Sequence, residues 1–286
     1  MSWSNYHGHC YYCDGKEVPE AYVKEALKQQ MRVIGFSCHA PLPFETGWTM
    51  PADKLDDYLT EIDQVTRNAP QGLTVLKSLE VDFIPGIMGP NHPDIQALGL
   101  DYVVGSVHYV DRLPNGNHWS IDNSNSEFAE GIQEIFKGDV QLAIQRYFEL
   151  QRQMLMEGSP DILGHCDKIR MHNLVHPHFS ETDEWYIREV HDLLKLAAEK
   201  QVVVEINTKY FTRKGIFFPS QDHFKYMFDN GVRVTINSDA HRPEALLSGF
   251  AEVAELLLKA GFTHLWEWDG DQFSPHSFSE EGINWS

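Results

Sequence analysis

Histidines and acidic residues are the side chains of this sequence with the most evident chemistry, and the first of them stand close together near its start. His7 and His9 are separated by one residue, so on a strand both would face the same side, as chelation of one ion requires. Asp14 follows shortly after. Imidazole and carboxylate groups suit zinc, manganese and iron, whereas calcium and magnesium sites are built mostly from oxygen atoms. A His-x-His pair alone is a weak signal, but it indicates a transition-metal site.

The same stretch holds a Cys-x-x-Cys pair, Cys10 and Cys13, which is typical of a redox pair or of half a zinc ribbon. The sequence has 4 cysteines and no second such pair, so a zinc ribbon is disfavoured. Cys10, Cys38 and Cys166 each stand beside a histidine. Since neighbours on a strand face opposite sides, we expect these cysteines to pack as small buried apolar residues if the histidines face a site.

Short strand-like runs alternate with helical patterns over the whole chain. The runs rich in β-branched and aromatic residues cover 3–7, 32–38, 73–83, 101–110, 161–166, 201–208, 233–239 and 263–268. Helical periodicity covers 19–30, 53–68, 140–157, 181–200 and 243–261. This alternation predicts an α/β fold with a parallel sheet. Neither linker-like composition nor a repeat divides the chain, so a single domain spanning residues 1–286 is expected.

The number and spacing of these runs favour a TIM-like barrel over an open dinucleotide-binding sheet, which would need a Gly-x-Gly-x-x-Gly turn after its first strand. In such a barrel the chemistry lies at the C-terminal ends of the strands. The longest irregular stretch, residues 111–126, directly follows a strand and is interpreted as a loop over a site.

Six histidines and three acidic residues lie at the C-terminal ends of the predicted strands or just after them. They are His7, His9, Asp14, His39, Glu80, His108, His165, Asp239 and His241. A barrel brings these strand ends together at one mouth, so the nine side chains are predicted to share one site. Neutral imidazoles crowd together only around cations, and about four ligands per ion imply more than one ion, with a bridging carboxylate.

The sequence carries 42 acidic and 23 basic residues, a formal net charge of −19. Such a surface repels phosphate backbones and anionic lipids, which disfavours a nucleic acid or a membrane as the main partner. No apolar run has the length of a membrane span, and the first residues lack the pattern of a signal peptide. A cytoplasmic protein is the simplest expectation.

Seven short segments, taken in order, are similar to the motifs of the polymerase-and-histidinol-phosphatase (PHP) superfamily. They read HGHCYYCDG, SCHAPLP, LEVDF, GSVHYV, GHCDKIR, EINT and NSDAH, and they span residues 6–245. The second, fourth and fifth resemble the histidinol-phosphatase branch most. The resemblance implies a distorted (β/α)7 barrel that holds three divalent ions of zinc, manganese or iron.

The resemblance also divides the nine candidate ligands among the three ions. The first ion would be held by His7, His9, Glu80 and Asp239, the second by Glu80, His108 and His165, and the third by Asp14, His39 and His241. Many histidinol phosphatases place a histidine one residue beyond the position of Asp14. The aspartate departs from that branch and matches other members of the superfamily.

Clustered divalent ions suit the hydrolysis of phosphate monoesters, because they lower the pKa of a bridging water and offset charge on the phosphoryl oxygens. The expected nucleophile is a hydroxide between the first two ions. Either Asp239 or His241, both next to the cluster, would protonate the leaving oxygen, and the sequence does not choose between them.

Arg170 and Arg213 are the expected phosphate-binding residues, because the fork of an arginine suits a phosphoryl group and both residues follow strand ends. The resemblance also suggests basic residues at these two places. Lys168 and Lys214 stand beside them as rivals.

Three other residues have two interpretations each. Glu205 is either a partner of a metal-bound histidine or a packed acid of the barrel. Trp119 and Asp122, in the 111–126 stretch, would suit the imidazole and the amine of histidinol phosphate, or would lie on an ordinary surface loop.

The sequence therefore predicts a metal-dependent phosphomonoesterase that hydrolyses L-histidinol phosphate, a small molecule of histidine biosynthesis. One alternative keeps the site and changes the substrate to phosphotyrosine, a nucleotide or an oligonucleotide end. Another is a non-catalytic module that only holds metal.

Overall fold

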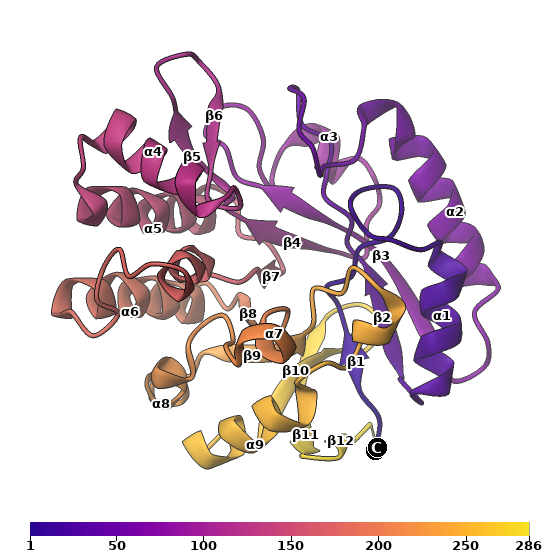
Figure 1. Cartoon of the computed structure of the whole chain (residues 1–286). Helices are drawn as coiled ribbons and strands as arrows, with labels where there is room; N and C mark the ends of the chain where they lie inside the picture. Colours follow the sequence, from indigo (N-terminus) through magenta and orange to yellow (C-terminus); the bar gives the residue numbers. More distant parts are fainter. Residues whose placement is uncertain (286) are drawn as a thin grey trace.

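The computed structural model describes residues 1–285, and its central feature is a parallel sheet that curves into a nearly closed barrel (Figure 1). The strands lie in the order β1 (Ser4–Asn5), β2 (Val33–Phe36), β3 (Thr74–Asp82), β4 (Tyr102–Ser106), β7 (Ile162–Leu163), β8 (Val203–Asn207) and β9 (Arg233–Asn237). All neighbours in this order pair in parallel. A parallel bridge between Gly8 and Ala240 joins the segment after β1 to the segment after β9. The predicted distorted (β/α)7 barrel is confirmed.

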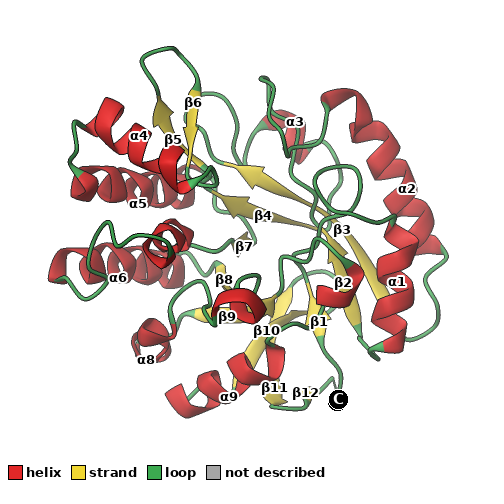
Figure 2. Cartoon of the chain, in the orientation of Figure 1, coloured by secondary structure: helices red, strands yellow, loops and turns green. Residues whose placement is uncertain are grey.

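The longer helices cover the outside of the barrel (Figure 2). The helices are α1 (Pro19–Lys28), α2 (Leu55–Arg67), α3 (Pro93–Gln96), α4 (Asn125–Phe136), α5 (Val140–Glu157), α6 (Glu184–Glu199), α7 (Phe211–Lys214), α8 (Phe224–Asp229) and α9 (Phe250–Ala260). Short 3-10 helices cover Ala52–Lys54, Lys168–Leu174, Gln221–His223 and Pro243–Ala245. Apolar side chains from the helices and from the strands pack together between the two layers, which buries both. Among the helices of residues 1–285, none has the length and apolar composition needed to cross a membrane.

One strand-like run lies outside the barrel. Residues 263–268 contain β10 (His264–Trp268), which pairs antiparallel with β11 (Phe273–Ser279), and β11 pairs with β12 (Gly282–Ile283). The exposure of this strand differs from that of a barrel strand. Positions along β10 alternate between buried and more exposed, whereas β8 is buried throughout. This small sheet packs on the barrel, where the ring of Phe273 contacts Tyr6 and Tyr102 at centroid distances of 5.0 and 5.9 Å.

The 111–126 stretch is more ordered than its composition indicates. It contains most of a β-hairpin, β5 (Tyr109–Arg112) with β6 (His118–Ser120), and leads into α4, a helix that the periodicity did not predict. Trp119 is 1% exposed, packs against Phe128 and Phe136, and donates from Nε1 to the Glu127 carbonyl at 3.1 Å. The expectation that Trp119 contacts a substrate is therefore wrong, because its ring belongs to the hydrophobic core.

Candidate metal centre

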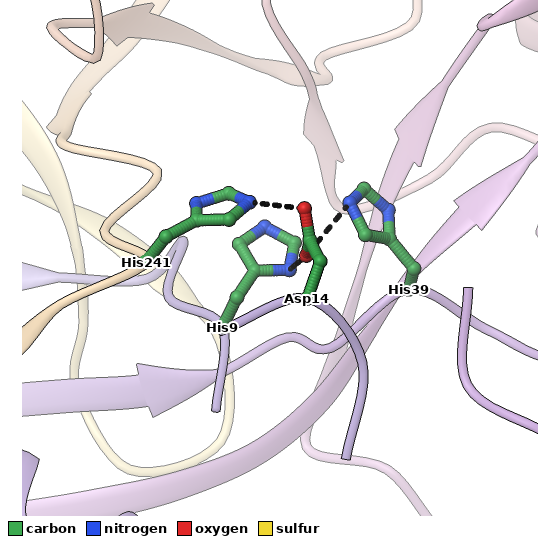
Figure 3. Close-up of side chains that lie close together, drawn as sticks. All are labelled: His9, Asp14, His39 and His241. Carbon is green, nitrogen blue, oxygen red and sulfur yellow. Dashed lines mark hydrogen bonds and ion pairs between the residues drawn. The ribbon is translucent and has the colours of Figure 1, made fainter. Parts of the chain in front are cut away.

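The nine side chains predicted to share one site meet at the C-terminal end of the barrel. They come from β3 and from the segments that follow β1, β2, β4, β7 and β9. Each has a ring nitrogen or carboxylate oxygen within 3.5 Å of another member. Seven of the nine are buried, whereas Asp14 and His241 are partly exposed at the mouth. Figure 3 shows these two residues with His9 and His39, which point toward one another.

Glu80 lies at the centre of the cluster, and its two carboxylate oxygens face two different sets of imidazoles. Oε2 lies 3.0 Å from His39 Nδ1, 3.1 Å from His7 Nε2 and 3.5 Å from His9 Nε2. Oε1 lies 2.9 Å from His165 Nε2 and 3.5 Å from His108 Nε2. This is the arrangement that a carboxylate bridging two cations needs.

Two aspartates complete the outer side of the cluster. Asp239 Oδ1 lies 3.1 Å from His9 Nε2 and 3.4 Å from His241 Nδ1. Asp14 Oδ2 lies 3.0 Å from His241 Nε2, and Asp14 Oδ1 lies 3.8 Å from His39 Nε2. One donor atom from each of His9, Asp14, His39 and His241 falls within 4.8 Å of the others, and so does one from each of His7, His9 and Glu80.

Three atoms of the cluster fit a metal better than they fit their neighbours. His9 Nε2, His39 Nδ1 and Asp14 Oδ1 are buried and have no hydrogen-bond partner among residues 1–285. His9 Nε2 is nevertheless only 3.1 Å from Asp239 Oδ1, and His39 Nδ1 only 3.0 Å from Glu80 Oε2, outside hydrogen-bond geometry. Buried polar atoms without partners are rare in folded proteins. A shared cation, of a kind that accepts imidazole and carboxylate ligands, would satisfy them.

Local backbone geometry places two of the aspartates. An added Cβ on Gly15 would overlap the backbone of His9 and Cys10, lying 2.6 Å from the Cα of Cys10, so only glycine lets the chain fold back there and aim Asp14 at the cluster. Asp239 follows β9 with a φ of 48°, a left-handed conformation that aspartate tolerates better than most residues.

Further carboxylates orient the histidines from behind. Glu205 Oε2 lies 2.8 Å from His7 Nδ1, and Glu205 Oε1 accepts from the backbone N–H of His165 at 2.7 Å. Glu205 is thus a partner of a candidate ligand, the first of its two interpretations. Asp82 Oδ1 plays the same part at 3.0 Å from His108 Nδ1. Sequence reasoning missed Asp82, although its position two residues after Glu80 on one strand places both acids on the same face.

The pKa values of Glu80, Asp239 and His9 shift toward the forms that bind metal, whereas Glu205 and Glu80 outweigh burial and raise the pKa of His7. Burial raises the pKa of the Glu80 carboxyl, but His39, His7 and the other imidazoles outweigh burial and hold that pKa well below its usual value. The pKa of Asp239 is also well below normal, since nearby positive groups outweigh burial. Burial lowers the pKa of His9 well below its usual value. Ionised carboxylates and neutral imidazole are the forms that bind cations.

The cations nearest the cluster are lysines. Lys168 Nζ is buried, 2.7 Å from Asp122 Oδ2 and 3.5 Å from His108 Nε2. Lys209 Nζ lies 3.1 Å from Asp239 Oδ1 and 3.3 Å from His241 Nε2.

The two predicted phosphate-binding arginines lie in different surroundings. Arg170 donates from Nε to Glu181 at 2.6 Å and from an Nη to the Phe217 carbonyl at 3.1 Å, and its contacts with the described residues include none of the nine. Arg213 is exposed and lines a cavity of about 330 Å³ together with Asp239 and His241. The structure therefore brings Arg213 to the edge of the cluster and leaves Arg170 in an ion pair.

An aromatic groove of about 940 Å³ adjoins the cluster. Its walls are the 43–48 segment and the β5–β6 hairpin, and Phe44 stacks on His118 across it at 4.0 Å. Trp48 stacks on Tyr109, with 5.7 Å between the ring centroids. It also contacts His39 in an edge-on arrangement, with 4.4 Å between the ring centroids. Trp48 therefore forms the boundary between the groove and the candidate ligands.

The barrel and its strand-end cluster define a class of barrel protein whose histidines and carboxylates are grouped as metal ligands are. A family model of the PHP domain matches residues 5–209, and the chain belongs to that family. It is 26% identical over 247 residues to the "Probable histidinol-phosphatase" of Deinococcus radiodurans, covering 85% of this chain and 87% of the relative.

Two solved structures share the fold. One is hisK of Listeria monocytogenes, proposed to be a histidinol phosphatase, with a TM-score of 0.74 and 17% identity over 87% of this chain and 99% of the other. The other is the histidinol phosphate phosphatase HISK of Lactococcus lactis in complex with zinc, L-histidinol and phosphate, with a TM-score of 0.66 and 20% identity over 99% of both chains.

Proposed function

We propose that this protein is a metal-dependent phosphomonoesterase that hydrolyses L-histidinol phosphate to L-histidinol and phosphate in histidine biosynthesis. The observation that carries the proposal is the position of Glu80, whose two oxygens face separate sets of buried imidazoles. The name of the Deinococcus relative and the ligands of the Lactococcus structure support the same substrate.

Three divalent ions of zinc, manganese or iron are the proposed cofactors. The proposed ligand sets are His7, His9, Glu80 and Asp239; Glu80, His108 and His165; and Asp14, His39 and His241. When bound, such ions supply an activated water as nucleophile and offset charge on the phosphoryl oxygens. Glu205 and Asp82 hold the rings of His7 and His108 from behind, which fixes the nitrogen that each ring presents to the site.

Fixed cations of the chain meet the phosphoryl group. Lys209 and Arg213 approach from the side of Asp239, and Lys168 approaches from the side of His108, where Asp122 holds it. In this proposal Arg170 has a structural role, because its ion pair with Glu181 anchors the 3-10 helix that carries Lys168.

His241 is the proposed proton donor to the leaving oxygen, and it fills this part only while its Nε2 is not bound to the third ion, since its Nδ1 faces the Asp239 carbonyl at 2.9 Å. The pKa of Asp239 is held well below its usual value, so its carboxyl is a poor proton donor. His241 stands partly exposed at the mouth, where a leaving group would depart.

The aromatic groove takes the leaving group. Its parallel and edge-on rings, Trp48, Tyr109 and Phe44, suit an imidazole ring, and the nearby Glu45 suits a cationic amine. A net charge of −19 also favours a substrate with a cationic end.

Phosphate release from L-histidinol phosphate tests this function, measured beside a panel of sugar, nucleotide and tyrosine phosphates with metal-loaded protein. We expect strong preference for histidinol phosphate. Preference for another ester would overturn the substrate and leave the metal chemistry, and release from none of them would favour the non-catalytic module.

A further inference from the structure

The cavity beside Asp239 and His241 has an unusual charge for this protein. Lys16, Lys209, Arg213 and Arg242 all line its volume of about 330 Å³. Among the described lining residues, Asp239 is the only acid, and it already faces the histidine cluster and Lys209. A chain with 42 acidic and 23 basic residues thus gathers four cations around one small opening. Like charges around one opening repel, so the arrangement favours an anion between them.

Three of these cations have no partner of their own. Within residues 1–285, the side chains of Lys16, Arg213 and Arg242 form no ion pair or hydrogen bond, whereas Lys209 is bound to Asp239. The backbone N–H of Lys16 donates to the His241 carbonyl at 2.9 Å, which fixes the loop after β1 against the loop after β9. The two loops that carry Lys16 and Arg242 are therefore held together at the edge of the cavity.

A buried hydroxyl points to the same conclusion. Ser248 Oγ lines the cavity, is buried from solvent and lacks a hydrogen-bond partner in the described chain. A buried donor without a partner is destabilising, and a phosphate oxygen would accept from it. The volume is at the lower end of the range for small-ligand sites, which suits a small oxyanion and its water better than a whole organic substrate.

We propose that the part of this basic cavity formed by Lys16, Arg242 and Ser248 is a second phosphate-binding site, beside the metal centre on the side of Asp239 and His241. Its ligand is a phosphoryl dianion, either free inorganic phosphate or a second phosphoryl group on a substrate. Lys209 and Arg213, assigned above to the reacting phosphate, form the side that faces the metal centre. A role in accepting product phosphate rests on the proposed function, whereas the binding site itself does not.

Titration calorimetry of inorganic phosphate into metal-loaded protein tests the site. The variant is the double substitution Lys16→Ala with Arg242→Ala. The matched control is Lys24→Ala with Arg188→Ala, which removes two exposed, unpaired cations elsewhere. We expect wild type and control to bind one more equivalent of phosphate than the variant, or the variant to bind that equivalent about tenfold more weakly. Equal stoichiometry and affinity in all three proteins would overturn the proposal.

A kinetic comparison identifies the source of the phosphoryl group. If the ligand is inorganic phosphate, the variant keeps its turnover of monophosphates and loses part of its inhibition by phosphate. If the ligand is a second group on the substrate, kcat/KM falls for a small bisphosphate and stays constant for a monophosphate. Ser248→Ala, which removes only the hydroxyl, should weaken phosphate binding several-fold in the same titration. If the wild type hydrolyses no ester but still binds one more equivalent of phosphate than the variant, the proposed function is refuted and the second site stands.

Discussion

Replacing Glu80 by glutamine changes the cluster at its centre while keeping the size of the side chain. Glutamine removes the negative charge and replaces one oxygen by an NH2 group, so one of the two sets of facing imidazoles loses its acceptor. Losing an outer partner of a metal ligand already costs about 10–100-fold in metal affinity. Loss of a shared, charged ligand should therefore lower the affinity for both neighbouring ions by at least about a hundredfold.

The expected loss of activity follows from the same contacts. Charge compensation by bound metal contributes several kcal/mol to phosphoryl transfer, and at about 1.4 kcal/mol per tenfold this corresponds to about a thousandfold in turnover. The assay is metal content per chain after dialysis, together with phosphate release. Glu267→Gln is the matched control, because Glu267 is equally buried but contacts Ser4 and Tyr6 instead of the histidines. Glu80→Gln protein with wild-type metal content and turnover would refute the bridging arrangement.

Three other perturbations test separate parts of the structure. Gly15→Ala should push Asp14 away from His241 and lower the affinity for one ion about tenfold or more, measured as metal content, with the circular dichroism of wild type. Trp48→Ala should lower kcat/KM about tenfold for histidinol phosphate and leave small non-aromatic esters unchanged, which substrate kinetics would show. Burial raises the pKa of Glu267 to about 7, whereas the unfolded side chain titrates near about 4.3. Between these values only the folded state keeps the proton, so the free energy of unfolding falls as pH rises, by about 4 kcal/mol in total. Glu267→Gln should remove that fall, and denaturation from pH about 5 to 8 would check it.

The barrel could be predicted because its strands and helices leave strong periodic signals. Parallel strands such as β8 are buried on both faces, so their sequences are apolar runs. Amphipathic helices alternate with these runs, and this alternation is typical of an α/β fold with a parallel sheet. The run at 263–268 is also rich in strand-forming residues, but its pairing with β11 is a tertiary choice that local sequence does not encode. The convergence of the nine side chains followed from topology, since strand ends meet at one mouth.

Side-chain direction was the part that sequence could not supply. Trp119 looks like a loop aromatic in sequence, yet α4 packs over it and turns it into core. Arg170 follows a strand end as predicted, but Glu181, which lies outside that motif, holds its guanidinium. Lys209 carries no motif of its own and reaches the cluster only because β8 and β9 are neighbours in the sheet.

The most direct test of the central claim is phosphate release from L-histidinol phosphate by metal-loaded protein, compared with the same protein after chelation and with Glu80→Gln. We expect turnover in the loaded wild type, loss after chelation, recovery when zinc, manganese or iron is restored, and no recovery in the variant. Turnover that survives chelation, or that the variant retains in full, would contradict a metal centre built on Glu80.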